Sequence, residues 1–277
     1  MQREIRQYNW KDGKTLTVGK RTLVMGILNI TPDSFSDGGQ WNGSDQALAH
    51  AEQLVKDGAD IIDIGAESTR PGFTPLSAEE EISRLEHILP VLLARVSVPV
   101  SIDTYKAATA AYALEQGVHM LNDIWGLQYG PEPGQMAAVA ARCDVPVVVM
   151  HNQCGNQYKD IISDMKAFFE KSAAIAAAAG IKADNIILDP GIGFGKTAEQ
   201  NIYVLRHLQE LTTLPYPMLL GTSRKGFIGK ILDLPVTERM EGTGATCVAG
   251  VLAGCSIVRV HDVISISRMC KMTDALL

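Results

Sequence analysis

The sequence lacks paired cysteines, and this absence limits what kind of protein it can be. No two of its five cysteines form a Cys-x-x-Cys pair. An odd and scattered set is a poor disulfide framework and a poor zinc site, and it is typical of a reducing compartment. We therefore expect a cytoplasmic protein whose thiols stay free: Cys143, Cys154, Cys247, Cys255 and Cys270.

An excess of positive charge and a long apolar run are also missing. The 25 Lys and Arg residues are outnumbered by 31 Asp and Glu, so the formal charge is −6. A nucleic-acid partner is not predicted, because such proteins usually carry a basic surface. No stretch approaches the roughly 18 apolar residues that span a bilayer. The opening MQREIRQYNWKDGK has no apolar run of a signal peptide either, so no membrane association is expected.

What the sequence does contain is a series of eight short apolar runs rich in Val, Ile and Leu. Runs of this kind are typical of strands that are buried on both faces of a parallel sheet. The runs are LVMGILNI from Leu23, DIIDIGAES from Asp60, PVSIDT from Pro99, HMLNDI from His119, PVVVMHN from Pro146, NIILDPG from Asn185, PMLLGTSR from Pro217 and SIVRVHD from Ser256.

Helix-like segments alternate with these runs. Ser77 and Glu80 form a capping-box pattern, and Gly58, Gly117 and Gly180 stand where helices should end. Eight βα units in about 250 residues favour a TIM-type (β/α)8 barrel, with an open doubly wound sheet as the competing architecture. The predicted helices cover residues 44–57, 77–95, 106–116, 134–142, 158–179, 197–211, 237–252 and 262–277.

The first twenty residues stand apart from this alternation. Asp12-Gly13 lies between short stretches of mixed polarity, which predicts a short N-terminal β-hairpin over residues 1–20. We expect it to lie as a flap across the N-terminal face of the barrel. No linker is evident, so we predict one domain over residues 1–277.

Every predicted strand turns polar at its carboxyl end. In a TIM barrel these ends surround one open mouth, where active sites lie. Each residue alone has a structural interpretation: Asp123 and Asp262 could cap helices, and His151 could be a hydrogen-bonded core histidine. Capping does not explain why so many charged groups converge. The polar residues are Asn29, the stretch 67–70, Asp103, Asn122, Asp123, His151, Asn152, Asp189, the stretch 223–225, Arg259 and His261.

The residue types suggest what this mouth binds. Arg70, Arg259 and His261 would form a cluster for an oxyanion or phosphate. A buried Asp189 suits a flat heterocycle with adjacent N–H donors, because a carboxylate accepts two parallel hydrogen bonds. Asn29 could help hold Mg²⁺, although a lone amide is a weak metal site. The ring therefore predicts a planar heterocycle at the bottom and a phosphate at the rim.

Two segments need separate interpretation. The loop 29–39 (NITPDSFSDGG) and the loop 68–74 (STRPGFT) are rich in turn residues, and we interpret both as mobile lids that place Phe35 and Phe73 over a ligand. The stretch 191–197 (GIGFGKT) looks like a phosphate-binding P-loop. Its spacing fails, because Pro190 occupies the position that needs the first glycine.

These stretches together resemble the dihydropteroate synthase family. The resemblance covers nearly the whole chain, with one motif per strand except the fifth. It implies the (β/α)8 fold, usually as a homodimer, and two small-molecule substrates: 6-hydroxymethyl-7,8-dihydropterin pyrophosphate and p-aminobenzoate. Ala66 and Gly226 depart from the family pattern without touching the predicted chemistry. The motifs are MGILNITPDSFSDGG, IGAESTRPG, SIDTYK, LNDIWG, LDPGIGFGKT, LLGTSRKGFIG and VRVHDV.

The resemblance also implies a role for each residue of the mouth. The catalytic set would be Asp103, Asp189, Lys225, Arg259 and His261. The pterin pocket would be Asp103, Asn122, Ile124, Met150, Asp189, Gly193, Phe194 and Lys225. Pyrophosphate would bind Asn29, which also touches Mg²⁺, together with Thr69, Arg70, Arg259 and His261. The p-aminobenzoate pocket would be Phe35, Pro71, Ser223 and Lys225.

The resemblance implies dissociative substitution, in which pyrophosphate leaves before the arylamine attacks, and inhibition by sulfonamides that mimic p-aminobenzoate. Two alternatives remain open from the sequence. One is a methyltetrahydrofolate-dependent corrinoid methyltransferase, which shares the pterin-binding barrel. The other is a catalytically silent pterin-binding homologue. One of the late helices, 237–252 or 262–277, is the expected dimer surface.

Overall fold

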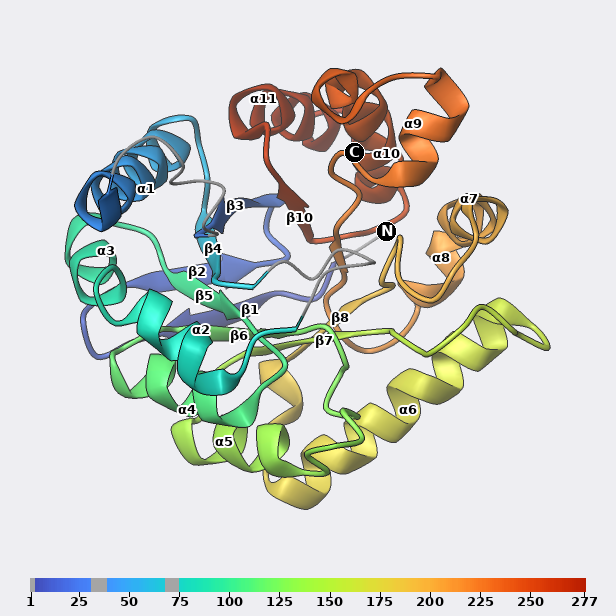
Figure 1. Ribbon diagram of the computed structural model, residues 1–277. Helices are drawn as coiled ribbons and strands as arrows, with labels where there is room; N and C mark the ends of the chain where they lie inside the picture. The colour runs from blue at the N-terminus through green and yellow to red at the C-terminus, as the bar shows by residue number, and fades with distance from the viewer. Residues whose placement is uncertain (1–2, 31–38, 68–74) are drawn as a thin grey trace.

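A barrel of eight parallel strands forms the centre of the molecule, and helices surround it (Figure 1). The computed structural model describes residues 3–30, 39–67 and 75–277. The strands follow the order β8-β7-β6-β5-β4-β3-β10-β9, and a bridge between Leu188 and Met218 brings the two ends of the sheet together. The strands are β3 (Leu23–Asn29), β4 (Ile61–Gly65), β5 (Val100–Asp103), β6 (Met120–Asp123), β7 (Val147–Met150), β8 (Ile186–Asp189), β9 (Leu219–Leu220) and β10 (Ile257–Val260).

Each of the eight apolar runs forms a strand, and the barrel prediction is confirmed. Successive side chains of a strand point to opposite faces, so one run supplies two apolar layers. In β3, Met25 belongs to the cluster inside the barrel, whereas Val24 and Leu28 pack in the layer beneath the helices. Burial on both sides explains why the runs are continuously apolar rather than alternating.

The predicted N-terminal hairpin is present and closes the N-terminal end of the barrel. It consists of β1 (Arg6–Asn9) and β2 (Thr15–Val18), which pair antiparallel. Tyr8, Leu16 and Val18 join the apolar cluster inside the barrel. Trp10 donates its indole N–H to the carbonyl of His119, 3.1 Å away at the start of β6. Ligand access is therefore left to the opposite, carboxyl end of the strands.

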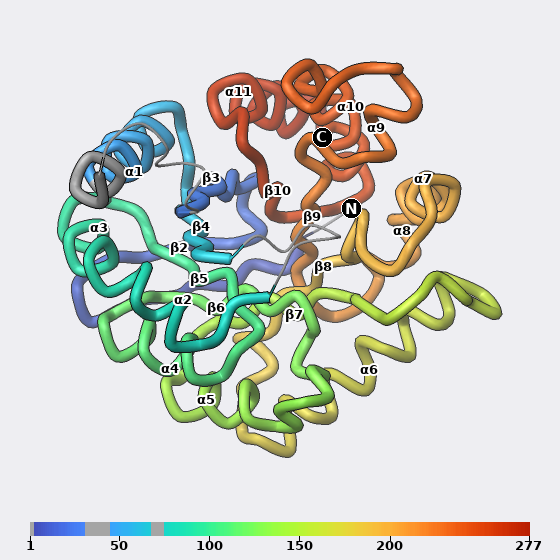
Figure 2. Tube along the Cα trace, in the orientation of Figure 1, coloured from blue at the N-terminus to red at the C-terminus, as the bar shows by residue number. Residues whose placement is uncertain are grey.

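The helices form an outer ring, visible in the tube drawing (Figure 2). Ser77 and Glu80 make the predicted capping box, with the Ser77 side chain accepting from the Glu80 N–H and the Glu80 carboxylate accepting from the Ser77 N–H. The helices are α1 (Gly39–Lys56), α2 (Ala78–Leu85), α3 (Leu89–Arg95), α4 (Ala107–Glu115), α5 (Gln135–Cys143), α6 (Ile161–Ala179), α7 (Ala198–Arg206), α8 (Leu208–Leu211), α9 (Gly226–Leu232), α10 (Met240–Leu252) and α11 (Val263–Asp274), with 3-10 turns η2 (Ala183–Asn185) and η3 (Val236–Glu238).

Several helices differ from the sequence-based expectation. The predicted helix 77–95 is two helices, because Pro90 lacks an N–H and starts a new helix in the first turn of α3. The predicted helix 197–211 also divides, at His207, into α7 and α8. Helix α1 begins at Gly39, five residues before the predicted start, and α9 was not predicted. Within the described residues, no helix is long and apolar enough to cross a membrane.

Candidate active site

Parallel strands deliver their carboxyl-terminal residues to one end of the barrel, and most of the predicted site residues lie there. Asn29 ends β3, Asp103 ends β5, Asn122 and Asp123 end β6, and Asp189 ends β8. Asp103, Asn122 and Asp189 are buried, whereas Asn29 is exposed. Arg259 occupies the third position of β10. The expected convergence of polar groups at the mouth is therefore present in the described residues.

Arg259 is the centre of a charged cluster at this mouth. Its Nε donates to Oδ2 of Asp63, and its Nη2 donates to Oδ2 of Asp103, both at 2.6 Å. Asn122 donates its side-chain amide to the same Asp63 oxygen at 2.9 Å. The Asp63 side chain is fully buried, whereas that of Arg259 is 20% exposed. The guanidinium therefore links β10 to both β4 and β5.

Asp63 was missed by the sequence analysis, although it stands in the run DIIDIG. It lies in the middle of β4, where neighbouring residues are apolar and buried. A charged residue inside such a strand is costly unless it is paired. That single polar interruption of an apolar strand was the available signal, and its partner Arg259 interrupts β10 in the same way.

The two aspartates of the cluster each keep one oxygen without a hydrogen bond. Oδ1 of Asp63 and Oδ1 of Asp103 are buried and have no partner among the described residues. Burial raises the pKa of Asp103, against the opposing charge of Arg259. Buried acceptors are normally satisfied. The free oxygen of Asp103, at the strand end, is therefore suited to accept a hydrogen from a ligand.

Asp189 forms a second buried carboxylate at the end of β8. Its Oδ1 accepts from the Gly191 N–H at 2.7 Å. Burial raises the pKa of Asp189 to about 6, while this hydrogen bond and the charges of Lys225 and Arg259 lower it. The carboxylate is therefore ionised at neutral pH and can accept hydrogens from a polar heterocycle.

An apolar wall lies beside these carboxylates. Ile124 and Met150 pack with Tyr105, and Phe194 packs against this cluster, as do Trp125 and Tyr129. The Lys225 ammonium lies over the Phe194 ring, 4.2 Å from its centroid. Cations are attracted to aromatic faces in this arrangement. The predicted pterin-pocket residues Ile124, Met150 and Phe194 are thus brought together.

Gly193 gives Lys225 room to reach this wall. Its φ of +87° is a conformation that side-chain-bearing residues rarely adopt. A Cβ at this position would also lie 2.9 Å from Cδ of Lys225. The backbone conformation therefore favours glycine, and a Cβ here would displace the end of the Lys225 side chain.

Ser223 and His261 lie in contact at the ends of the last two strands. The Ser223 hydroxyl is 2.9 Å from Nδ1 of His261 and accepts from the His261 backbone N–H at 3.1 Å. The sequence placed Ser223 with p-aminobenzoate and His261 with pyrophosphate. Their contact means that the two predicted subsites would share a border here.

The remaining predicted residues lie outside the described residues: Phe35, Thr69, Arg70, Pro71 and Phe73. The residues on either side of the loop 68–74 are described. Glu67 accepts from the Leu76 N–H at 2.8 Å and from the Lys106 ammonium at 2.6 Å. Lys106 also lies 3.2 Å from Glu81. One buried lysine thus holds two buried carboxylates next to the mouth.

The expected helix caps had different outcomes. Asp123 accepts from the Trp125 and Leu127 N–H groups at 2.8 and 2.7 Å, so it caps the turn after β6. Asp262 makes no side-chain cap. The capping prediction for Asp262 is wrong, because its two oxygens receive Nε and Nη2 of Arg224 at 3.0 and 2.6 Å. A bidentate arginine pair is stronger than a hydrogen bond to one backbone N–H.

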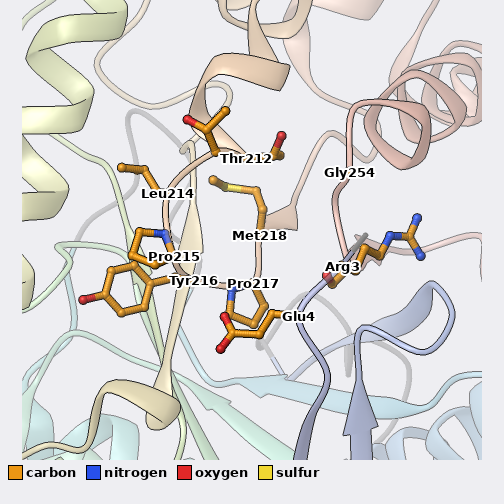
Figure 3. A pocket seen from close by; sticks show the side chains of 11 residues that line it. Arg3, Glu4, Thr212, Leu214, Pro215, Tyr216, Pro217, Met218 and Gly254 are labelled. Atoms are coloured by element: carbon orange, nitrogen blue, oxygen red, sulfur yellow. The ribbon is translucent and has the colours of Figure 1, made fainter. Parts of the chain in front are cut away.

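A polar pocket also exists at the other end of the barrel (Figure 3), lined by Arg3, Glu4, the stretch 212–218, Gly254 and Ser256. Its charged groups are already paired. Arg3 donates to Asp274 and to the Val251 carbonyl, and Glu4 accepts from Arg6. Residues at this end of a TIM barrel usually serve stability. We therefore place the candidate site at the carboxyl end of the strands.

A metal ion would find few ligands among the side chains of this mouth. The described part of the chain has no group of three or more His, Cys, Asp and Glu side chains arranged to hold one. Asn29 offers one exposed amide oxygen. Mg²⁺ often binds through one or two protein groups together with substrate phosphates and water. The residues therefore fit an ion that arrives with a phosphorylated substrate, not a resident metal centre.

Comparison with known proteins agrees with this geometry. The family model described as "Pterin binding enzyme" matches residues 25–261. A dihydropteroate synthase of Bacillus subtilis (strain 168) is 52% identical over 262 residues, covering 95% of this chain and 91% of that protein. The chain belongs to the pterin-binding enzyme family. Within that family it belongs with the dihydropteroate synthases, which are transferases of folate biosynthesis.

Solved structures of dihydropteroate synthases share the whole fold. The Clostridium difficile enzyme, determined in the presence of pteroic acid, gives a TM-score of 0.90 at 52% identity and covers 94% of this chain and 98% of its own. The Xanthomonas albilineans enzyme with 4-aminobenzoic acid gives 0.90 at 37% identity, covering 96% of both chains. The Yersinia pestis enzyme in a sulfonamide complex gives 0.88 at 39%, covering 98% of both.

Proposed function

We propose that this chain condenses 6-hydroxymethyl-7,8-dihydropterin pyrophosphate with p-aminobenzoate, giving 7,8-dihydropteroate and pyrophosphate. The observation that carries the proposal is the pair of buried carboxylates, Asp103 and Asp189, beside the wall that contains Phe194. A pterin is a flat ring with N–H donors along its edge, so it matches two acceptors next to an aromatic surface. The relatives solved with pteroic acid and 4-aminobenzoic acid support the same substrates.

In this proposal the pterin ring lies at the bottom of the mouth. Asp189 accepts from the pyrimidine side of the ring, and the free Oδ1 of Asp103 accepts from another ring N–H. Asn122 and Lys225 serve the remaining polar atoms of the ring. Ile124, Met150, Gly193 and Phe194 line its faces. The buried position of both carboxylates supports this arrangement, because a ligand that replaces water must satisfy them.

The pyrophosphate would lie at the rim, bound by Arg259 and His261, with Asn29, Thr69 and Arg70. Of the three guanidinium nitrogens of Arg259, Nε and Nη2 hold Asp63 and Asp103, so Nη1 is the nitrogen that would face the phosphate. The p-aminobenzoate pocket would form next to it from Phe35, Pro71, Ser223 and Lys225. The contact between Ser223 and His261 supports adjacent subsites for the leaving group and the incoming amine.

The reaction would proceed by dissociative substitution. The bond between the pterin methylene carbon and the pyrophosphate oxygen breaks, and its electron pair leaves with pyrophosphate. The amine nitrogen of p-aminobenzoate then forms the new C–N bond and releases a proton. Asp103 and Asp189 would stabilise the cationic pterin, and Arg259 and His261 would stabilise the leaving group. Exclusion of water would protect the cation from hydrolysis.

Mg²⁺ would be held by the pyrophosphate oxygens with Asn29 as its protein ligand, and it would supply charge neutralisation to the leaving group. The exposed amide of Asn29 at the mouth supports this role. Calorimetric titration of pyrophosphate with and without Mg²⁺ would test it without turnover. Replacement of Asn29 by alanine should weaken pyrophosphate binding more in the presence of Mg²⁺ than in its absence.

We also propose that the enzyme is a cytoplasmic homodimer. Three late side chains support an interface on α10 or α11: Leu252 is 53% exposed, Ile264 43% and Met272 61%. Exposed apolar groups on neighbouring helices favour association. Free thiols at all five cysteines are consistent with a reducing compartment. Sedimentation equilibrium should give the mass of two chains, and a charged residue at Leu252 should shift it toward one.

The proposed function is tested by identifying the product and by one variant. Incubation of both substrates with Mg²⁺ should give 7,8-dihydropteroate by mass spectrometry, and a sulfonamide should compete with p-aminobenzoate. The Asp103→Asn variant should lower kcat much more than pterin affinity, since a neutral amide binds the ring but stabilises its cation less. Equal losses of kcat and affinity would limit Asp103 to binding. No pteroate from wild type would refute the function.

A further inference from the structure

Lys196 is a partly buried cation for which the proposed reaction has no use. It belongs to the stretch GIGFGKT, whose sequence looks like a P-loop but whose spacing fails. Its ammonium lies 3.0 Å from the Gly191 carbonyl, 3.0 Å from the Phe194 carbonyl and 2.9 Å from Nδ1 of His151. An ammonium has three donors and no acceptor, so these three contacts use all of its hydrogens.

His151 is built to act as the third acceptor. Its side chain is 2% exposed, and burial together with the Lys196 charge lowers its pKa to about 3. The ring is therefore neutral and can accept at Nδ1. The rings of Phe168 and Phe169 contact it edge-on and fix its orientation. The lysine thus binds a rigid partner directly after β7, not a mobile side chain.

The two carbonyls belong to the turn that shapes the proposed pterin pocket. The Gly191 N–H is the group that donates to Asp189. The Phe194 N–H closes the turn on the Gly191 carbonyl at 3.1 Å, and the Phe194 ring lies beneath the Lys225 ammonium. Holding both ends of this turn therefore fixes the direction of one carboxylate and the position of one aromatic wall.

Gly191 shows how closely this turn is packed. Its φ is +63°, and a Cβ there would lie 1.9 Å from the His151 carbonyl oxygen. The His151 N–H in turn donates to the Asp189 carbonyl at 2.9 Å, which continues the pairing of β7 with β8. The backbone of the turn is thus in close contact with the end of β7. Without the lysine, the Phe194 carbonyl and Nδ1 of His151 would lose this donor, and the Gly191 carbonyl would keep only the Phe194 N–H.

We propose that Lys196 is a positioning residue of the pterin site, whose ammonium holds the turn 191–194 so that Asp189 and Phe194 meet the pterin ring. This inference rests on the proposed function. It differs from a phosphate-binding role of the kind that the GIGFGKT stretch suggests, because all three donors face the protein. Burial lowers the pKa of Lys196 to about 7, and three acceptors favour its charged form.

The test is the Lys196→Met variant, which keeps the length of the side chain and removes its donors. Affinity for the dihydropterin pyrophosphate, measured by calorimetry without p-aminobenzoate, should fall by about tenfold to a hundredfold, as expected for a small misplacement of binding groups. The KM for p-aminobenzoate at saturating pterin should change less than twofold. The matched control is Lys230→Met, which removes an exposed lysine paired with Glu199 on the neighbouring α7 and should change neither value.

A second variant covers the case in which Lys196→Met does not fold. His151→Leu removes one acceptor and keeps the lysine. It should therefore weaken pterin binding, but by less than the tenfold to hundredfold loss expected for Lys196→Met. In a double-mutant cycle the two changes should be strongly non-additive. Pterin affinity within twofold of wild type in Lys196→Met would overturn the proposal, as would equal losses for both substrates. Asp189→Asn tests the proposed site itself: unchanged pterin affinity in that variant would refute the pterin site, independently of Lys196.

Discussion

Replacement of Arg259 by methionine would remove the cation on which the charged cluster depends. Methionine keeps most of the side-chain volume, so the change is mainly electrostatic. Two hydrogen bonds of 2.6 Å would be lost, one from Asp63 and one from Asp103. Asp63 would keep only the amide of Asn122 as a donor, and the Asp103 carboxylate would keep none among the described residues. Two buried carboxylates would then share the mouth without the guanidinium that joins them, and the charge of Lys225 would be left to act on Asp103.

The expected cost follows from this geometry. Breaking a buried ion pair by removing one partner costs about 3–5 kcal/mol, because the other charge stays buried. The Arg259 side chain is 20% exposed, so solvent screening brings the estimate to about 3 kcal/mol. At this chain length we expect Tm to fall by about 6 °C. Differential scanning calorimetry and urea titration would measure both quantities.

Two further variants decide whether uncompensated buried charge causes the loss of stability in Arg259→Met. Adding Asp63→Asn to Arg259→Met removes one of the uncompensated carboxylates and should recover part of the lost stability. Lys230→Met removes an exposed pair and should leave Tm unchanged within error, since exposed pairs contribute little. If Arg259→Met unfolds no earlier than Lys230→Met, or if Asp63→Asn makes it worse, the argument from uncompensated buried charge is wrong.

Three other predictions concern the surroundings of the mouth. Lys106→Met leaves its two buried carboxylate partners without a counter-ion and should cost about 3–5 kcal/mol in a denaturant titration; a loss below 1 kcal/mol would contradict this. Gly191→Ala should lose more stability than Gly134→Ala, since both have positive φ but only the first places a Cβ against the His151 carbonyl; equal losses would contradict the clash. Pterin affinity should fall as pH drops through about 6, because protonation of Asp189 removes an acceptor. The Asp189→Asn variant should show a weaker dependence on pH, which Asp103 then carries because burial raises its pKa as well; a wild-type affinity constant from pH 5 to 8 would refute the prediction.

The fold was largely predictable because the strands of a barrel can be recognised in a single sequence by their continuous apolar character. A strand buried on both faces must be apolar along its length, and all eight such runs became strands. The boundaries of the helices were harder to predict from the sequence. The break at Pro90 follows from a known effect of proline that was not applied, whereas α9 lay in a stretch interpreted as a strand-end motif. The end of α7 at His207 has no clear signal in the sequence.

The sequence predicted which side chains gather at the mouth of the barrel, but not their contacts with one another. Strand ends and motifs pointed to Asp103, Asp189 and Arg259. That Arg259 is shared between two aspartates depends on which strands neighbour each other, and β10 lies beside β3, far from it in sequence. Asp63 lies in the middle of its strand, so the polar strand ends gave no signal for it. The contact of Lys196 with His151 was not predictable either, since the two residues lie in loops that follow different strands.

Pyrophosphate release from 6-hydroxymethyl-7,8-dihydropterin pyrophosphate, in the presence of Mg²⁺, tests the central claim most directly. It should be measured with and without p-aminobenzoate by a coupled phosphate assay. The proposed reaction predicts release that depends on p-aminobenzoate, with one pteroate formed per pyrophosphate. Tight pterin binding with no release under either condition would contradict the synthase reaction, and it would leave a methyltransferase relative or a pterin-binding protein in its place.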